Sequence, residues 1–148
     1  MSGNLCTLAY VSRATTPFTD EDLTNLLSLS RNKNELRGIT GMLLYCSGSF
    51  FQIIEGPQLA IDQLYDTLLG DKRHCDIRRL IYRDAQARAF SKWSMAFKHF
   101  DGAAAVSVDG FSEFLDNGTV EIAENRPELM AMINMFVSLF DDHHKPVR

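Results

Sequence analysis

The sequence predicts an α+β protein with the element order βαββαβ and a mixed sheet that carries both helices on one face. Two segments, 19–34 and 57–70, repeat leucine and other apolar residues at helical spacing. Short apolar runs rich in strand-forming residues precede, separate and follow them. This order matches the split βαβ, ferredoxin-like arrangement.

The first strand is predicted over Leu5–Ser12, and Arg13–Pro17 signal the loop that ends it. Thr19, with Asp22 three residues later, has the pattern of a helix N-cap. The helix that follows is expected to end near Asn34. Its apolar positions share one side: Leu23, Leu26, Leu27 and Leu29.

Two apolar runs, Gly38–Cys46 and Phe50–Glu55, are joined by Ser-Gly-Ser and predict a β-hairpin. A second helix should enter at Pro57 and leave at Gly70. Its apolar positions at helical spacing are Leu59, Ile61, Leu64, Tyr65, Leu68 and Leu69.

Two further strands are expected over Ile77–Ala85 and Trp93–Phe100, which completes the ferredoxin-like order. We therefore assign residues 1–101 to one domain and 102–148 to a linker with C-terminal helices. Within this linker, Val106–Leu115 could hold a short helix. The helix predicted from Pro127 to Phe140 has an apolar stripe that must cover something hydrophobic. We expect it to cap the sheet face left bare by the other helices; contact with a partner is the alternative.

Composition excludes several classes of function. The 148 residues carry a net charge of −4, so the chain has no general electrostatic attraction to DNA or RNA. No apolar run approaches the roughly 18 residues of a membrane span, and no secretory signal precedes the first strand, so a cytoplasmic location is expected. The cysteines, Cys6, Cys46 and Cys75, are scattered without metal-ligand spacing, so no metal site or disulfide is predicted.

Motifs for common chemistry are missing from the sequence. It has no glycine-rich phosphate loop and no GxSxG nucleophile motif. His74 follows the second helix, where it can bind an anion or interact with the helix C-terminus. Nothing here favours a hydrolase.

Polar side chains within apolar strands are the most informative feature. Tyr10 lies in the first strand and Gln52 in the third, and these strands are neighbours in a ferredoxin-like sheet. A buried amide without a partner costs roughly 2–7 kcal/mol, so Gln52 needs hydrogen bonds. The two side chains form a self-satisfied core pair, or both reach a polar ligand between the two helices.

Six fragments follow one another in a fixed order along residues 4–101: LAYVS, SRNKN, GITGMLLY, FFQIIEGP, DKRH and FSKWSM. Together they resemble the BLUF family, blue-light sensors that use flavin adenine dinucleotide. The resemblance implies FAD as cofactor, with FMN or riboflavin as possible substitutes, bound between the two helices.

The resemblance also assigns positions in the flavin site. Leu26 and Leu68 would flank the ring, and Asn34 would bond its pyrimidine edge. The full set of implied flavin-contacting residues is Tyr10, Leu26, Lys33, Asn34, Gln52, Thr67, Leu68, Asp71, Arg73 and His74.

The mechanism that the resemblance implies is a photochemical one. Tyr10 gives an electron to the excited flavin while its proton moves through Gln52. Gln52 is left rotated or tautomerised with a stronger hydrogen bond to the flavin C4 carbonyl, which shifts absorption slightly to the red. Trp93 and Met95 would sense the change, because the last strand is expected to adjoin Gln52.

No catalytic output is implied, so the signal should pass to a separate downstream protein or through a homo-oligomer. Two alternatives stay open at this point. One is a flavin-dependent oxidoreductase, and the other is an interaction module without cofactor in which the Tyr10–Gln52 pair is structural.

Overall fold

A computed structural model describes residues 4–89, 96–99, 106–107 and 126–141. Within these residues, six strands form a single sheet in the order β4-β1-β3-β2-β5-β6. In chain order the elements are β1 Leu5–Ala14, α1 Asp20–Arg37, β2 Thr40–Cys46, β3 Ser49–Pro57, α2 Gln58–Leu69, β4 His74–Asp84, β5 Ala96–His99, β6 Val106–Ser107 and α5 Pro127–Asp141.

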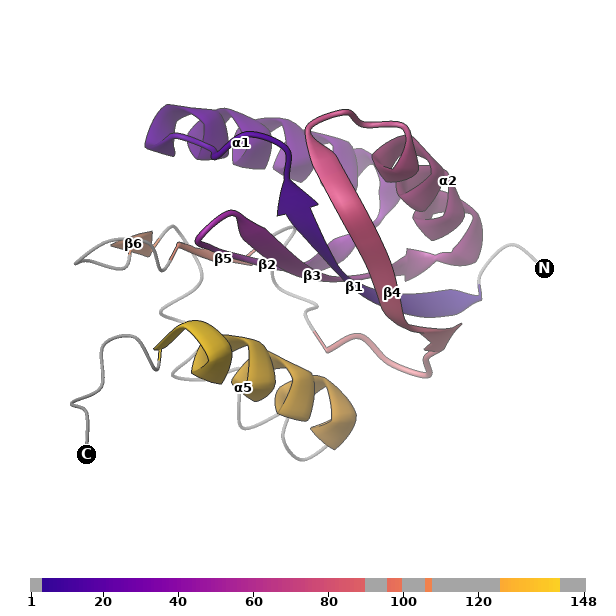
Figure 1. The fold of residues 1–148 in the computed structure, drawn as a ribbon. Helices are drawn as coiled ribbons and strands as arrows, with labels where there is room; N and C mark the ends of the chain where they lie inside the picture. The colour runs from indigo at the N-terminus through magenta and orange to yellow at the C-terminus, as the bar shows by residue number, and fades with distance from the viewer. Residues whose placement is uncertain (1–3, 90–95, 100–105, 108–125, 142–148) are drawn as a thin grey trace.

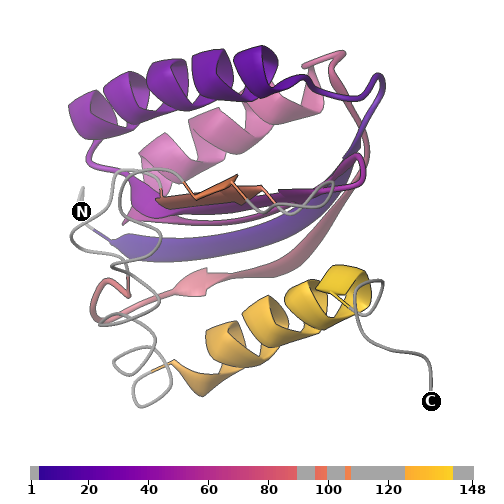
Figure 2. The ribbon, with the colours of Figure 1, turned by 90° about the vertical axis from the view of Figure 1, so that its left-hand side faces the viewer.

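The sheet separates two layers of helices. Helices α1 and α2 lie over one face, and α5 lies under the other (Figures 1 and 2). Strand β1 runs antiparallel to both β3 and β4, β2 runs antiparallel to β3, and β5 pairs parallel with β2. The predicted ferredoxin-like α+β fold with a mixed sheet is therefore confirmed.

The ends of α1 follow directly from the residues found there. The Thr19 side chain accepts from the backbone N–H of Asp22, whose own side chain accepts from the Thr19 N–H, so the capping box is formed. Gly38 ends the helix with φ at 71°, a left-handed conformation that glycine adopts without steric cost. The helix thus runs three residues past the predicted end at Asn34.

A two-residue turn closes the β2–β3 hairpin. Ser47 and Gly48 both have positive φ, at 49° and 79°, as the right-handed twist of paired strands requires. Gly41 on β2 serves a different purpose, because a Cβ there would lie 2.1 Å from the carbonyl oxygen of Ile53. Only glycine lets β2 and β3 approach so closely at this point.

Each face of the sheet has its own hydrophobic core. The residues under α1 and α2 are Cys6, Leu8, Tyr10, Leu23, Leu27, Ile39, Leu43, Tyr45, Phe50, Ile54 and Ile61. The opposite core packs Ala9, Met42, Leu44, Cys46, Phe51, Ile53, Ala89, Leu129, Ile133 and Phe136. Because the last three belong to α5, this helix caps the bare sheet face, which settles the alternative left open by its apolar stripe. None of the described helices is long and apolar enough to cross a membrane.

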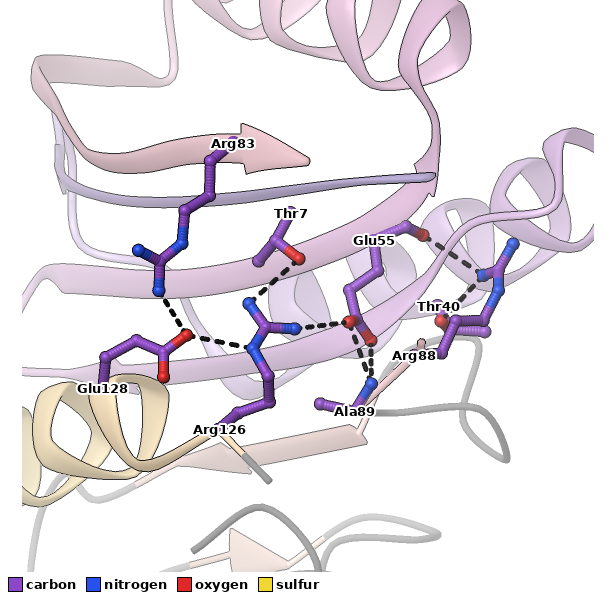
Figure 3. A network of polar contacts seen from close by, with 8 residues as sticks. All are labelled: Thr7, Thr40, Glu55, Arg83, Arg88, Ala89, Arg126 and Glu128. Carbon is purple, nitrogen blue, oxygen red and sulfur yellow. Dashed lines mark hydrogen bonds and ion pairs between the residues drawn. The ribbon is translucent and has the colours of Figure 1, made fainter. Parts of the chain in front are cut away.

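A buried polar network fastens α5 to the sheet (Figure 3). The Glu55 side chain on β3 has no exposed surface, and its two oxygens accept from the Ala89 N–H at 2.9 Å each. Arg126, immediately before α5, lies 3.6 Å from the same carboxylate. The Arg126 guanidinium also donates to Glu128 at 2.9 Å and to Thr7 at 3.3 Å. One carboxylate therefore holds both the start of α5 and the segment that follows β4.

Arg88 adds a second set of contacts beside this carboxylate (Figure 3). Its guanidinium donates to the carbonyl oxygen of Gly38 at 2.6 Å, to the hydroxyl of Thr40 at 2.9 Å and to the carbonyl oxygen of Glu55 at 3.3 Å. The segment after β4 is thus fixed against the beginning of β2 and the end of β3.

Several sequence-based predictions need correction or lie outside the described residues. The last strand was expected to adjoin Gln52, but β5 pairs with β2, and Leu43 of β2 lies between Gln52 and Phe97 in register. Strand β3 is already paired with β1 on one edge and with β2 on the other, so β5 cannot pair with it. Because β4 occupies the outer edge of β1, the outer edge of β2 is the one that β5 takes. Of the helix expected within 106–115, Val106 and Ser107 are strand β6, and the rest is not described. The domain boundary at 101 also falls outside the described residues.

Candidate functional site

A cavity of about 140 Å³ opens between α1, α2 and the sheet. By this measure one water molecule needs roughly 10–15 Å³, so the space admits a group much larger than a few waters. Every residue that the sequence predicts to contact flavin lines this cavity: Tyr10, Leu26, Lys33, Asn34, Gln52, Thr67, Leu68, Asp71, Arg73 and His74. Trp93 and Met95, predicted as the sensors of the change, lie outside the described residues.

Tyr10 and Gln52 meet at the sheet wall of the cavity. They are direct partners in the β1–β3 register, and both side chains are buried. The Tyr10 phenol donates a hydrogen bond to Oε1 of Gln52. The amide thus presents its oxygen end to the phenol, and turning the amide would present its NH₂ end instead.

Burial raises the pKa of the Tyr10 phenol well above its usual range, and the nearby Tyr65 and Asp71 raise this pKa further. Removal of the hydroxyl from water disfavours the charged phenolate. Tyr10 therefore stays protonated at neutral pH and acts as the donor in its bond to Gln52.

Apolar side chains face each other across the cavity. Leu26 comes from α1, and Leu64 and Leu68 come from α2, one helical turn apart. Leu43 and Ile54 provide apolar surface from β2 and β3. The middle of the site is therefore a slot between aliphatic walls, suited to a flat apolar ring.

Polar side chains also line the cavity, from the last turns of α1 and from the loop after α2. Lys33 and Asn34 line it from the last turns of α1, and Asn34 is only 2% exposed. Asp71 and Arg73 line it from the loop after α2, where their side chains form a salt bridge at 2.7 Å. Hydrogen bonds and charge from Arg73 lower the pKa of Asp71 to about 2, against the opposing effect of partial burial.

The salt bridge predicts a pH dependence that is confined to acid. The Asp71 pKa is depressed on folding, so its stabilisation is complete above the unfolded value near 3.8 and is lost as pH falls through about 2. Urea unfolding should show Asp71→Asn less stable than wild type at pH 7, with a difference that shrinks between pH 4 and 2. Arg73→Gln should reproduce this loss; an unchanged difference at pH 2 would contradict the assignment.

His74 lies four residues after Gly70, the C-cap of α2, and is the first residue of β4. Its Nδ1 lies 3.1 Å from the Ser12 hydroxyl oxygen, and its ring centroid lies 4.9 Å from that of Phe50. Burial lowers the pKa of His74, although Asp71 opposes this shift. The imidazole is therefore neutral at pH 7 and does not provide a cation to an anion or to a helix C-terminus.

Sequence reasoning missed part of the cavity lining. The residues not predicted are Leu29, Ser30, Leu43, Phe50, Ile54, Leu64 and Tyr65. A signal existed for several of them: Ser30 is four residues from both Leu26 and Asn34, and Phe50 and Ile54 alternate with Gln52 on one side of β3. Among the described residues, no group of His, Cys, Asp and Glu is arranged to hold a metal ion.

The lining fits the isoalloxazine ring of a flavin in its chemistry. This ring has an apolar benzenoid end, which suits the aliphatic slot between α1 and α2. Its pyrimidine end has carbonyl acceptors and an N–H donor. The Asn34 and Gln52 amides each offer a donor and an acceptor and can match both kinds of group.

Comparisons with known proteins identify the family. Residues 5–96 match the family model BLUF, described as sensors of blue-light using FAD. The photoactivated adenylate cyclase subunit alpha of Euglena gracilis is 44% identical over 75 residues, which are 51% of this chain and 7% of that protein. Because the match covers so little of this relative, its cyclase activity is not attributed to this chain.

Solved structures agree in fold and sequence. BlrB, a BLUF protein in its dark state, is 29% identical with a TM-score of 0.64, over 89% of this chain and 86% of its own. Klebsiella pneumoniae BlrP1 with FMN and cyclic diGMP is 27% identical with a TM-score of 0.64, over 94% of this chain and 35% of its own. Because the family model spans more than half of the chain, this protein belongs to the BLUF family of blue-light sensors that use FAD.

Proposed function

We propose that this protein is a blue-light photoreceptor whose response begins at the Tyr10–Gln52 pair. The observation that carries the proposal is the hydrogen bond from Tyr10 to Gln52 at the wall of the cavity. A purely structural pair would satisfy its hydrogen bonds within the packed core, away from any cavity. This pair instead lines a space suited to a flavin. The proposed cofactor is FAD. FMN or riboflavin can take its place, because the sequence contains no glycine-rich phosphate loop that would require the diphosphate of FAD.

The residues that hold the flavin are the predicted set. Leu26 and Leu68 contact opposite faces of the ring from the two helices, and Asn34 and Gln52 bond its pyrimidine edge. The rest of the predicted set completes the lining: Lys33, Thr67, Asp71, Arg73 and His74. This arrangement excludes water from the Tyr10 side of the cavity, because the side chains of both Tyr10 and Gln52 are buried.

The chain contributes an electron, a proton path and a movable amide. When bound, the flavin absorbs blue light and, while excited, accepts an electron that it later returns. Tyr10 supplies that electron, and an oxidised phenol is strongly acidic, so its proton moves to Oε1 of Gln52 along the existing hydrogen bond. The protonated amide gives one proton back to Tyr10 as the electron returns. If this proton leaves from nitrogen, Gln52 remains as its imidic tautomer; if it leaves from oxygen, Gln52 remains an amide whose donor and acceptor ends exchange by rotation.

Illumination of purified protein is the direct test. The yellow holoprotein should show a small red shift of its visible absorption under blue light and should recover in the dark, because the exchanged amide donates a stronger hydrogen bond. An unchanged spectrum would contradict the proposal. Oxidation of NAD(P)H in the dark would favour an oxidoreductase, and a colourless preparation that refuses added flavin would favour an interaction module.

Strand β3 is the proposed route by which the signal leaves the cavity. Gln52 faces the cavity, while its neighbours Phe51 and Ile53 face the α5 core. The Phe51 ring stacks on Phe136 of α5, with centroids 5.4 Å apart and an interplanar angle of 24°. A shift of β3 at Gln52 is therefore transmitted to α5 through packed side chains.

The proposed output is a change in how α5 and the neighbouring chain contact a separate protein or a second copy of this chain. Trp93 and Met95 remain proposed sensors on the segment that leads into β5. The same proposal includes a cytoplasmic location. It also includes no direct binding to nucleic acid, which agrees with the net charge of −4.

A further inference from the structure

Tyr65 contacts the proposed photochemical pair from the helix side of the cavity. It belongs to the stripe of α2 that faces the sheet and lies one turn after the buried Ile61. Its ring meets that of Tyr10 edge-on, with centroids 6.2 Å apart and an interplanar angle of 61°. Both rings line the same cavity. None of the roles proposed above uses Tyr65.

The Tyr10–Gln52 hydrogen bond alone does not fix the Tyr10 ring. It specifies where the phenol oxygen lies, but it weakens at the moment when the Gln52 amide exchanges its ends. A phenol that turned aside at that moment would fail to recover its proton from the same amide. Something other than Gln52 must then keep the ring in place, and the edge of Tyr65 contacts it directly.

We propose that Tyr65 is a positioning residue for Tyr10, whose edge contact keeps the phenol aligned with Gln52 while the amide turns. This inference rests on the proposed photoreceptor function, which it deepens. Edge-to-face aromatic pairs prefer this arrangement beyond the surface that they bury, by amounts that correspond to about a two- to tenfold change in the population of the aligned ring.

The ring of Tyr65 and its hydroxyl act differently, which makes them separable. The edge contact belongs to the ring, so phenylalanine at this position should keep it. The neighbouring Tyr65 phenol also helps to raise the pKa of Tyr10, after burial and ahead of Asp71. Tyr65→Phe therefore removes the effect of the Tyr65 hydroxyl on the pKa of Tyr10, which is smaller than that of burial, and retains the ring contact. Tyr65→Leu removes both the hydroxyl and the ring.

The experiment compares Tyr65→Leu, Tyr65→Phe and Tyr82→Phe in the flavin-loaded protein. Tyr82 of β4 is the matched control. Its hydroxyl donates a hydrogen bond at 2.5 Å to Asp62 of α2, the helix that also carries Tyr65, but Tyr82 does not line the cavity. Two quantities are measured: the flip rate of the Tyr10 ring in the dark, by NMR of labelled tyrosine rings, and the yield of red-shifted protein per absorbed photon.

In Tyr65→Leu the ring of Tyr10 should flip faster and the yield should fall about two- to tenfold. Tyr65→Phe and Tyr82→Phe should stay close to wild type in both measurements. If Tyr65→Leu yields too little folded protein, Tyr65→Ile replaces it. The inference would be overturned if Tyr65→Leu had the same flip rate and the same yield as the wild-type protein. A wild-type protein without any red shift would overturn the proposed function instead, and the flip rates measured in the dark would still test the contact.

Discussion

Gln52→Leu should abolish the reversible red shift while leaving a folded, flavin-binding protein. Leucine fills a similar volume at the cavity wall but has neither donor nor acceptor, so no exchange of hydrogen bonds can follow illumination. The substitution also leaves the buried Tyr10 hydroxyl without its acceptor. Loss of such a partner costs about 1–3 kcal/mol of stability. Difference absorption spectra and urea unfolding measure the two effects.

Tyr10→Phe is the complementary variant. It keeps the amide but removes the hydroxyl that supplies the proton, so the normal red shift should again be lost. In the double variant Tyr10→Phe/Gln52→Leu, both polar groups are gone, and much of the stability lost in Gln52→Leu should return, because no buried group is left unpaired. A normal red shift in either single variant would contradict the proposed mechanism.

Arg126→Leu should lower the free energy of unfolding by about 3–5 kcal/mol, which is the usual cost of removing one partner of a buried ion pair. Glu55 has no exposed surface, and Arg126 is its cationic neighbour at 3.6 Å, itself only 15% exposed. Without Arg126 the carboxylate stays buried but loses this cationic neighbour, while it still accepts from the Ala89 N–H (Figure 3). Urea unfolding measures the loss.

The double variant Glu55→Gln/Arg126→Leu is the matched control for this prediction. It removes both charges, so the cost of an uncompensated buried carboxylate disappears and a substantial part of the stability should return. If the double variant is as unstable as the sum of its single variants, the ion pair is not what holds α5 to β3.

The same substitutions test whether β3 transmits the signal to α5. Hydrogen exchange of the α5 amides should differ between dark and illuminated wild-type protein, because Phe51 and Glu55 connect this helix to the strand of Gln52. In Glu55→Gln/Arg126→Leu the flavin red shift should remain, while the light-dependent change in α5 should diminish. Equal exchange in dark and light in the wild type would contradict the proposed route.

Particular residues explain which predictions succeeded. Thr19 and Asp22 predict the start of α1 correctly, because the capping box needs only two residues that are three positions apart. The Ser47–Gly48 turn likewise depends on adjacent residues alone. The prediction that Tyr10 and Gln52 are neighbours required the ferredoxin-like strand order, and the β1–β3 register confirms it. Their roles towards flavin, like those of the other lining residues, stay predictions.

The predictions that failed involved segments without strong local signals. The strand predicted from Ile77 begins three residues earlier, at His74, because pairing with Ala14 of β1 extends it beyond its apolar run. The last strand was expected beside Gln52 and instead lies beyond β2. In both cases long-range pairing decided the outcome, and the residues themselves are compatible with either arrangement.

The sequence by itself determined the order of elements, the helix caps, the hairpin turn and the side chains available for photochemistry. These depend on spacing and on residue types that act within a few positions of one another. Only the tertiary structure decided that Tyr65 touches Tyr10, that Glu55 meets Arg126 and which side chains of the sheet α5 packs against. Such contacts join residues from distant parts of the chain, and their formation depends on how whole layers pack, which no local pattern specifies.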